Sequence, residues 1–364
     1  MVDVASPVSF TGPELVKNGE RHVYFHSGSE ATYRKVSEKP SGFTSIPTID
    51  LTGLDGPPAS RRKIAKDIYD ACHECGFFYI KNHGIPQEVI TETFELLQKF
   101  FALDLDVKMD AHVQKNRAIR GYEPMLETRL DPRTAGDIKE AFTMGDCVIE
   151  REQDYVGRTG KQPPTHITQP QNIWPEKAGW WREAFGMDET AFDSNFQFPI
   201  TGMRALYYPP TPVTQDAASV GLGAHADFSW LTLVLQEDNV QALEVLNPDG
   251  VWVDAPPQPG TLVCNVGQYL ERQTNGQFPA TVHRVRNRTG QERYSLPFFL
   301  TMDPDVELDV LECCKEPGEA PKYGPINVGD LYVRRVLPAR KKHPTSIKFR
   351  DVPQEQWSYR MLLS

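Results

Sequence analysis

The sequence predicts an α+β protein in which a helical N-terminal half precedes a C-terminal half folded as a jelly roll. In the N-terminal half, apolar residues recur every three or four positions, the period of an amphipathic helix. After Phe196, short alternating segments separated by turn residues follow one another, which is typical of an antiparallel double sheet or barrel. The chain has 364 residues, 39% of them hydrophobic and 24% charged, enough to build such a core.

In the N-terminal half the fold proper is expected to begin with a strand at 46–51. A helix follows, with an apolar stripe from Ile64 to Cys75 and Gly76 placed to cap its end. Residues 77–80 are expected to form a short buried strand, and Pro86 to open a second helix. Another helix is predicted from the region of Trp174, Trp180 and Trp181 through Phe192. Six strands are then expected, at 203–208, 230–235, 243–246, 261–266, 281–286 and 293–300.

These elements divide the chain into four parts. Residues 1–45 are polar and rich in Gly and Pro, and we expect an extension that wraps or caps the body. Residues 46–195 form the helical and mixed region, 196–303 the jelly-roll core, and 304–364 a C-terminal extension that shapes access to the pocket.

Composition excludes several classes of function. The net charge of −10 argues against a nucleic-acid surface, and no apolar stretch approaches the roughly 20 residues that cross a bilayer. No secretion signal is visible, so we expect a cytoplasmic chain with reduced cysteines. Cys72 and Cys75 have the spacing of a redox pair or half a zinc site, but they lie on the apolar stripe and are expected to be core. A basic cluster is interpreted as a solvated face: Arg334, Arg335, Arg340, Lys341 and Lys342.

The candidate metal ligands are His225, Asp227 and His283. Residues two apart on a strand share a face, so His225 and Asp227 can reach one ion, and His283 lies in another alternating segment. Two imidazoles and one carboxylate are a ligand set for non-haem Fe(II) that leaves open positions. A His-x-Asp triplet alone is weak, however, and His283 alone would be interpreted as a core histidine.

A candidate carboxylate clamp lies close to the second histidine. Arg293 and Ser295 are two apart on a predicted strand and share a face, and a guanidinium grips a carboxylate through two parallel hydrogen bonds. A turn at 287–290 is centred midway between His283 and Arg293. If the hairpin closes symmetrically, these two residues lie opposite each other on adjacent strands.

Together these motifs resemble the Fe(II)/2-oxoglutarate-dependent oxygenases, and most closely the isopenicillin N synthase-like family. The resemblance covers about 46–303 and rests on His225–Leu233, His283–Val285, Arg293–Phe299, Ile46–Leu51, Cys75–Phe78, Asn82–Pro86, Gly121–Tyr122, Lys139–Glu140 and Asn275–Gly276. It implies a double-stranded β-helix, a distorted jelly roll, with iron held by His225, Asp227 and His283. It also implies that Arg293, Ser295 and Tyr208 hold 2-oxoglutarate.

The cofactors implied are Fe(II), 2-oxoglutarate and O₂, with ascorbate as a reductant in vitro. The sequence departs from the family pattern at Leu206, where members often carry asparagine, and at Gln268, where aspartate is common. We expect the first change to remove a polar contact to the co-substrate and the second to be structural.

The function implied is oxidative decarboxylation of 2-oxoglutarate coupled to hydroxylation, desaturation or cyclisation of a small organic molecule, in specialised metabolism. Two alternatives stay open. An iron oxidase or oxidative cyclase on the same scaffold would use no 2-oxoglutarate, and its Arg-x-Ser pair would grip a substrate carboxylate. A jelly-roll binding protein that has lost its metal is the third interpretation.

Arg204, Leu206 and Tyr208 alternate, so Arg204 is expected to face the cavity and to pair with an anionic group of the prime substrate. An arginine satisfied by Asp or Glu at the barrel mouth is an equal alternative. Further candidates for the substrate pocket flank the metal motif or lie upstream: Phe228, Trp230, Tyr122 and Phe142. Phe228 and Trp230 fit core positions better than a substrate wall.

Overall fold

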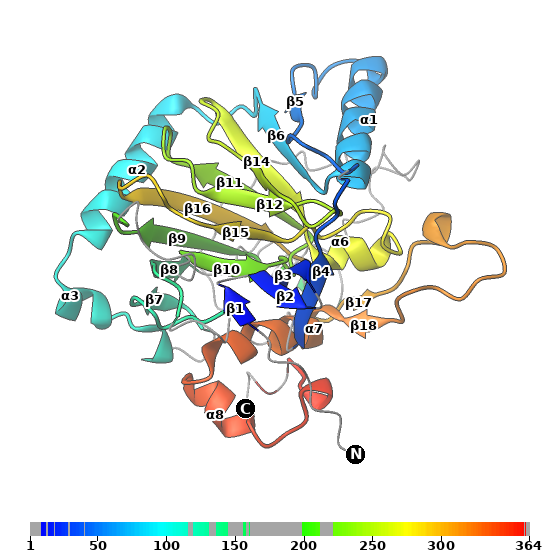
Figure 1. Cartoon of the computed structure of the whole chain (residues 1–364). Coiled ribbons are helices and arrows are strands. Elements are labelled where there is room, and N and C mark those ends of the chain that lie inside the picture. The colour runs from blue at the N-terminus through cyan, green and yellow to red at the C-terminus, as the bar shows by residue number, and fades with distance from the viewer. Residues whose placement is uncertain are drawn as a thin grey trace.

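The jelly-roll core is present in the computed structural model as two facing sheets (Figure 1). The structure describes residues 9–11, 14–17, 19–27, 30–39, 41–115, 119–130, 136–144, 156–157, 160, 199–211, 221–359 and 361. The helix expected from Trp174 to Phe192 lies outside these residues. Within them, the strands of the core form two eight-stranded sheets, and a two-stranded sheet lies apart.

The first sheet contains, in spatial order, β1 (Ser9–Thr11), β2 (Glu14–Lys17), β3 (Glu20–Ser27), β10 (Leu222–His225), β15 (His283–Val285), β12 (Leu243–Leu246) and β13 (Trp252–Asp254), with β4 (Glu30–Lys35) paired to β3. The second contains β5 (Thr48–Asp50), β6 (Phe77–Lys81), β14 (Thr261–Val266), β11 (Leu231–Gln236), β16 (Arg293–Leu300), β9 (Gly202–Tyr208), β8 (Glu140–Met144) and β7 (Gly121–Glu123). The predicted strands at 243–246, 261–266 and 293–300 have the observed bounds.

The N-terminal segment contributes strands, which the expectation of a polar extension did not include. β3 pairs with β10 in parallel, with His26 opposite His225, so these strands extend the first sheet. Val23 and Tyr24 of β3 are buried. β3 is not an edge strand, because β2 and β4 pair with it as well.

The helices are α1 (Pro58–Glu74), α2 (Gln87–Phe101), α3 (Leu105–Met109), α6 (Gln268–Gln273), α7 (Val328–Val336) and α8 (Pro344–Phe349), with 3₁₀ turns η1 (Val113–Lys115), η3 (Glu312–Cys314), η4 (Pro338–Arg340) and η5 (Gln354–Gln356). The backbone of Gly76 has a φ of +70°, which favours glycine, and its N–H caps α1 by donating to Ala71 O. Cys72 and Cys75 are buried free thiols, as expected of core residues.

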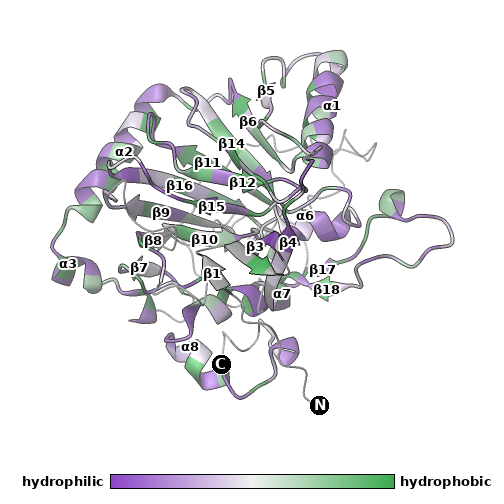
Figure 2. Ribbon diagram, in the orientation of Figure 1, coloured by the Kyte–Doolittle hydropathy of each residue, from purple (hydrophilic) through white to green (hydrophobic). Residues whose placement is uncertain are grey.

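Helices α1 and α2 cover the outer face of the second sheet. Ile64 and Ile68 of α1 pack in one cluster with Phe78, while Leu97 and Phe101 of α2 pack against Ala205 and its neighbours. Figure 2 shows hydrophobic residues along the strands and hydrophilic ones over much of both helices. The inner face of the second sheet is thereby left to face the first sheet and the cavity between them.

The symmetrical hairpin expected around residue 288 is wrong. β15 belongs to the first sheet, where it pairs with β10 and β12, whereas β16 belongs to the second and pairs with β9 and β11. Residues 286–292 therefore cross from one sheet to the other. His283 and Arg293 do not lie side by side on paired strands but reach one cavity from facing sheets.

The C-terminal residues lie below the two sheets and close one end of the space between them (Figure 1). They contain the small sheet of β17 (Glu307–Leu308) and β18 (Ile326–Asn327), then α7 and α8. The basic cluster is not simply a solvated face, because Arg334 Nε donates to Trp357 O and the Arg340 side chain is only 12% exposed. Among the described helices, none combines the length and apolarity needed to cross a bilayer.

Candidate active site

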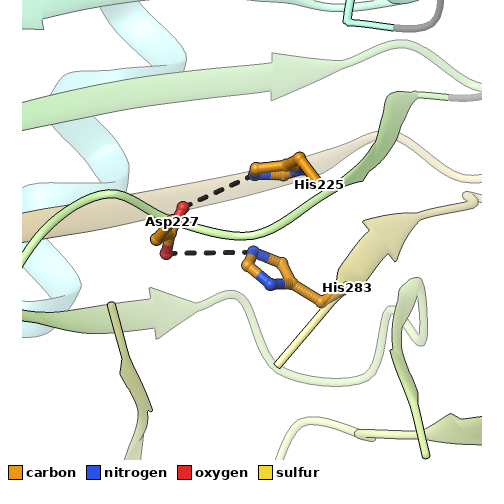
Figure 3. A group of neighbouring side chains, drawn as sticks. All are labelled: His225, Asp227 and His283. Carbon is orange, nitrogen blue, oxygen red and sulfur yellow. Dashed lines mark ion pairs between the residues drawn. The ribbon is translucent and has the colours of Figure 1, made fainter. Parts of the chain in front are cut away.

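His225, Asp227 and His283 converge at one point between the sheets (Figure 3). One ligand atom from each lies within 4.8 Å of the others. His225 ends β10 and His283 begins β15, and these two residues are opposite one another in the antiparallel pair. Asp227 is not on the strand, as strand alternation assumed, but in the loop that follows it. The convergence therefore depends on how this loop turns back.

The loop after β10 is fixed by the start of α6. Gln268 N donates to Asp227 O at 2.8 Å, and Gly267 N donates to Trp230 O at 3.1 Å. A Cβ on Gly267 would lie 1.9 Å from Ser229 O, so only glycine allows this approach. The backbone N–H groups of Gly267 and Gln268 thus hold the loop that carries Asp227.

Both imidazoles present Nε2 to the centre. His225 Nδ1 lies 2.8 Å from Gly223 O, and His283 Nδ1 lies 3.2 Å from Thr281 O. A carbonyl oxygen only accepts, so each Nδ1 carries a proton, and in the neutral imidazole each Nε2 then keeps its lone pair. The Nε2 atoms lie 3.5 Å and 3.9 Å from the Asp227 carboxylate oxygens. Burial lowers the pKa of His283 to about 4, which keeps it neutral at neutral pH.

The Asp227 carboxylate is held in its ionised form. Burial opposes ionisation, but at the low pH where His283 and His225 are protonated their charges, with a hydrogen bond from Asn265, outweigh burial and hold the pKa of Asp227 well below its ordinary value. Its Oδ2 accepts from Thr232 Oγ1 at 2.7 Å and from Asn265 Nδ2 at 2.9 Å. These two bonds fix the carboxylate plane, as partners around a metal ligand do.

This donor set fits an Fe(II) ion. Two neutral nitrogens and one carboxylate oxygen on one side of a point are the facial arrangement that leaves positions open for further ligands. His225, Asp227 and His283 are the residues that would hold the metal.

The candidate clamp lies on the inner face of the second sheet. Arg293 and Tyr208 are register partners on β16 and β9, and the guanidinium carbon lies 5.1 Å from the Tyr208 ring centroid. Arg293 Nη1 donates to Ser295 Oγ at 3.3 Å and Nη2 donates to Gln236 Oε1 at 2.9 Å. Arg293 is 1% exposed, and both its Nε and the Tyr208 hydroxyl are buried without a hydrogen-bond partner among the described residues. Such donors suit a carboxylate ligand.

One cavity of about 1060 Å³ joins the triad and the clamp. Its wall includes the three candidate metal ligands, the clamp residues Arg293, Ser295 and Tyr208, and Leu206, whose side chain has no polar atom. Its volume lies at the upper end of the range for small-molecule sites, so it can hold a co-substrate and a second small molecule together.

Of the four aromatic candidates, only Phe228 is among the described residues that line the cavity. Trp230 is buried in the core and donates from Nε1 to Gln273 Oε1, as its core interpretation expected. The expectation that Tyr122 and Phe142 border the pocket is corrected. Tyr122 donates its hydroxyl to Glu140, and Phe142 packs under α2, because it neighbours Ala205 on the outer face of the sheet.

Arg204 does line the cavity, and it also has an acidic partner, so both interpretations of it describe part of the structure. Its Nη2 lies 2.5 Å from Glu123 Oε2. Sequence reasoning missed Glu123, Arg340, Gln236, Thr232 and Asn265 as neighbours of the site. Thr232 and Asn265 face the site from predicted strands, so alternation could have suggested them, whereas no local pattern connects Glu123 with Arg340.

The chain matches two family models. Residues 46–177 match the non-haem dioxygenase in morphine synthesis N-terminal model, and residues 199–302 match the 2OG-Fe(II) oxygenase superfamily model. The chain is 33% identical over 311 residues to the 2-oxoglutarate-Fe(II) type oxidoreductase hxnY of Emericella nidulans, covering 79% of this chain and 88% of that protein. It is 31% identical over 307 residues to homoarginine-6-hydroxylase 2-ODD-C23.1 of Arabidopsis thaliana, covering 75% and 90%.

Solved structures show the same architecture. A full-length protein of Neurospora crassa in complex with alpha-KG superposes with a TM-score of 0.69 at 25% identity, over 82% of this chain and 98% of that one. A putative 2OG-Fe(II) oxygenase family protein from Caulobacter crescentus gives a TM-score of 0.66 at 27% identity, over 81% and 99%.

Proposed function

The chain belongs to the Fe(II)/2-oxoglutarate-dependent oxygenases of the isopenicillin N synthase-like family, and we propose that it hydroxylates a small organic molecule with iron held by His225, Asp227 and His283. The family uses Fe(II) and 2-oxoglutarate. The observation that carries the assignment of residues is the convergence of three ligand atoms within 4.8 Å, in the cavity that also contains the Arg293 guanidinium.

With both groups bound, O₂ oxidises 2-oxoglutarate to succinate and CO₂, and the second oxygen atom enters a C–H bond of the prime substrate as a hydroxyl group. The residues of the chain hold the metal and the co-substrate in position and exclude water from them. The Nδ1–H bonds of the two histidines keep both Nε2 lone pairs aimed inward, and Thr232 with Asn265 fixes the carboxylate. Arg293 and Ser295 would receive the distal carboxylate of 2-oxoglutarate from the facing sheet.

The names of relatives favour hydroxylation of a small molecule over desaturation or cyclisation. One relative is called a homoarginine-6-hydroxylase, and the Neurospora crassa protein has been solved with alpha-KG and thymine. The 2-oxoglutarate-independent alternative has no such support, because these relatives are named for 2-oxoglutarate or bind it. We also propose, by analogy with the fold family alone, that the substrate belongs to specialised metabolism.

The proposal is tested by incubating the purified chain with small-molecule extracts, Fe(II), ascorbate and 2-oxoglutarate. We expect one compound to gain one oxygen atom, with succinate formed in equal amount. A compound that loses two hydrogen atoms instead would replace hydroxylation by desaturation or cyclisation. Product formation without succinate would contradict the proposal.

Thr232→Val should weaken iron binding without removing a ligand. The substitution keeps the shape of the side chain but removes the hydrogen bond to Asp227 Oδ2 at 2.7 Å. Loss of such a partner lowers metal affinity by about 10- to 100-fold, which anaerobic equilibrium dialysis with Fe(II) measures. Thr261→Val is the matched control, because Thr261 Oγ1, at the start of β14, donates to the Gln258 carbonyl and not to a residue of the triad. Equal affinity in Thr232→Val and wild type would contradict the assigned role.

A further inference from the structure

A second cationic group lies on the cavity wall, separate from the Arg293 clamp. Arg204 on β9 and Arg340 in the C-terminal segment share the carboxylate of Glu123, which ends β7. Arg204 Nη2 lies 2.5 Å from Glu123 Oε2, and Arg340 Nη2 and Nε lie 2.8 Å and 3.1 Å from Oε1. Thr128 Oγ1 also donates to Oε2. One carboxylate thus fixes two guanidiniums that come from distant parts of the chain.

The carboxylate of Glu123 lies behind the cavity wall, and the two guanidiniums lie at its surface. Glu123 is 1% exposed and does not line the cavity, whereas Arg204, Arg340 and Thr128 do. Two guanidiniums and one carboxylate leave one positive charge at the wall. Lys139 and Asp137 are buried close by, and the carboxylate of Asp137 also attracts both guanidiniums.

Among the described residues that act on one another here, the cationic side chains Arg204, Arg340 and Lys139 outnumber the carboxylates of Glu123 and Asp137 by one. A buried net charge is costly unless an opposite charge accompanies it. Burial, and after it the charge of Arg204, lowers the pKa of Lys139 to about 7, although Glu123 and Asp137 act in the opposite direction. Arg204 Nε is also buried without a hydrogen-bond partner among the described residues. The cavity is the side from which an anion could reach both guanidiniums.

We propose that Arg204 and Arg340 form a binding site for a carboxylate group of the prime substrate, with Glu123 holding the two guanidiniums in place. This inference deepens the proposed function and rests on it. The planar forks of two guanidiniums suit a planar carboxylate, which they can grip through parallel hydrogen bonds. Because Arg340 belongs to the C-terminal segment, the site is complete only when that segment is docked against β7 and β9.

The test measures binding rather than turnover. The full-length chain is loaded with Mn(II) and 2-oxoglutarate and titrated with pairs of probes, benzoate beside benzamide and hexanoate beside hexanamide, using ligand-observed NMR. We expect each acid to bind at least about tenfold more tightly than its amide. Phenyl phosphate, as a third probe, should bind no more tightly than benzoate. Acids that bind no better than amides, or that do not bind, would overturn the inference, and preference for phenyl phosphate would overturn the choice of carboxylate.

Variants of the two arginines test whether the preference for acids arises at the proposed site. Arg204→Met and Arg340→Met should each abolish most of the preference for acids, and each leaves Glu123 paired with the other arginine. Lys348→Met removes an exposed charge from α8, outside the cavity wall, and should keep the preference. Persistence of the preference in both arginine variants would overturn the inference.

Affinity for 2-oxoglutarate distinguishes the two proposals. It should be unchanged in Arg204→Met and Arg340→Met, because Arg293 and Ser295 lie elsewhere on the wall, and this also shows that both variants are folded. If the wild-type chain fails to bind 2-oxoglutarate, the proposed function fails. The preference of the cavity for acids over amides can still be measured in the absence of 2-oxoglutarate, so the two proposals can fail separately.

Discussion

Asp227→Asn should reduce Fe(II) affinity on the order of a thousandfold and stop succinate formation, while leaving the chain folded. The substitution keeps the size of the side chain but removes the anionic ligand from a set of three. We expect this to remove roughly a third of the free energy with which a typical site binds its metal. The asparagine oxygen can still accept from Thr232 Oγ1, so the loop after β10 should keep its position.

Bound iron after anaerobic equilibrium dialysis is the measurement, with circular dichroism to establish folding. Asp254→Asn is the matched control, since it removes the same charge from an exposed position on β13 in the first sheet. Iron binding close to that of wild type in Asp227→Asn would remove Asp227 from the ligand set.

Glu123→Gln should destabilise the fold by about 3–5 kcal/mol, the usual cost of removing one partner from a buried ion pair. Arg204 and Arg340 would lose their counter-ion, and the new amide group would turn hydrogen-bond donors toward guanidinium donors. Urea unfolding at neutral pH measures the difference. Glu307→Gln on β17 is the control, because Glu307 is exposed. A loss below about 1 kcal/mol would show that the cluster is not organised by this carboxylate.

The same carboxylate makes stability depend on pH. Burial disfavours its charged form, but Arg204, Arg340 and Lys139 outweigh burial and hold the pKa of Glu123 well below its ordinary value of 4.5. As the pH falls through about 4.5, the unfolded chain takes up a proton that the folded chain does not, so stability is lost with falling pH. Glu123→Gln should lack this component, and unfolding curves recorded between neutral pH and about pH 3 should converge for the two proteins.

The sequence predicted the parts of this protein that depend on local pattern. Three strands have the predicted bounds, and the stripe from Ile64 to Cys75 is the buried face of α1. The same reasoning brought His225, Asp227 and His283 together, although the strand that was to carry Asp227 ends at His225. The convergence came instead from a loop fixed by Gly267 and Gln268.

Relations between distant segments could not be predicted in this way. A turn near residue 288 predicts a hairpin only when both strands belong to one sheet, and β15 and β16 belong to facing sheets. β3 could not be placed in the first sheet from the sequence, because its partner β10 lies far along the chain. Arg340 looks solvated in sequence because its partner, Glu123, lies 217 positions away.

The central claim is that a metal triad and a carboxylate clamp from facing sheets hold one iron–2-oxoglutarate chelate. Anaerobic titration of the Fe(II)-loaded chain with 2-oxoglutarate tests it most directly, followed by the visible charge-transfer absorption of an iron(II)–2-oxo acid chelate. We predict that the absorption saturates at one 2-oxoglutarate per bound iron, and that Arg293→Met weakens this binding at least about tenfold. Stoichiometric iron binding without the absorption, or affinity unchanged in Arg293→Met, would contradict the claim.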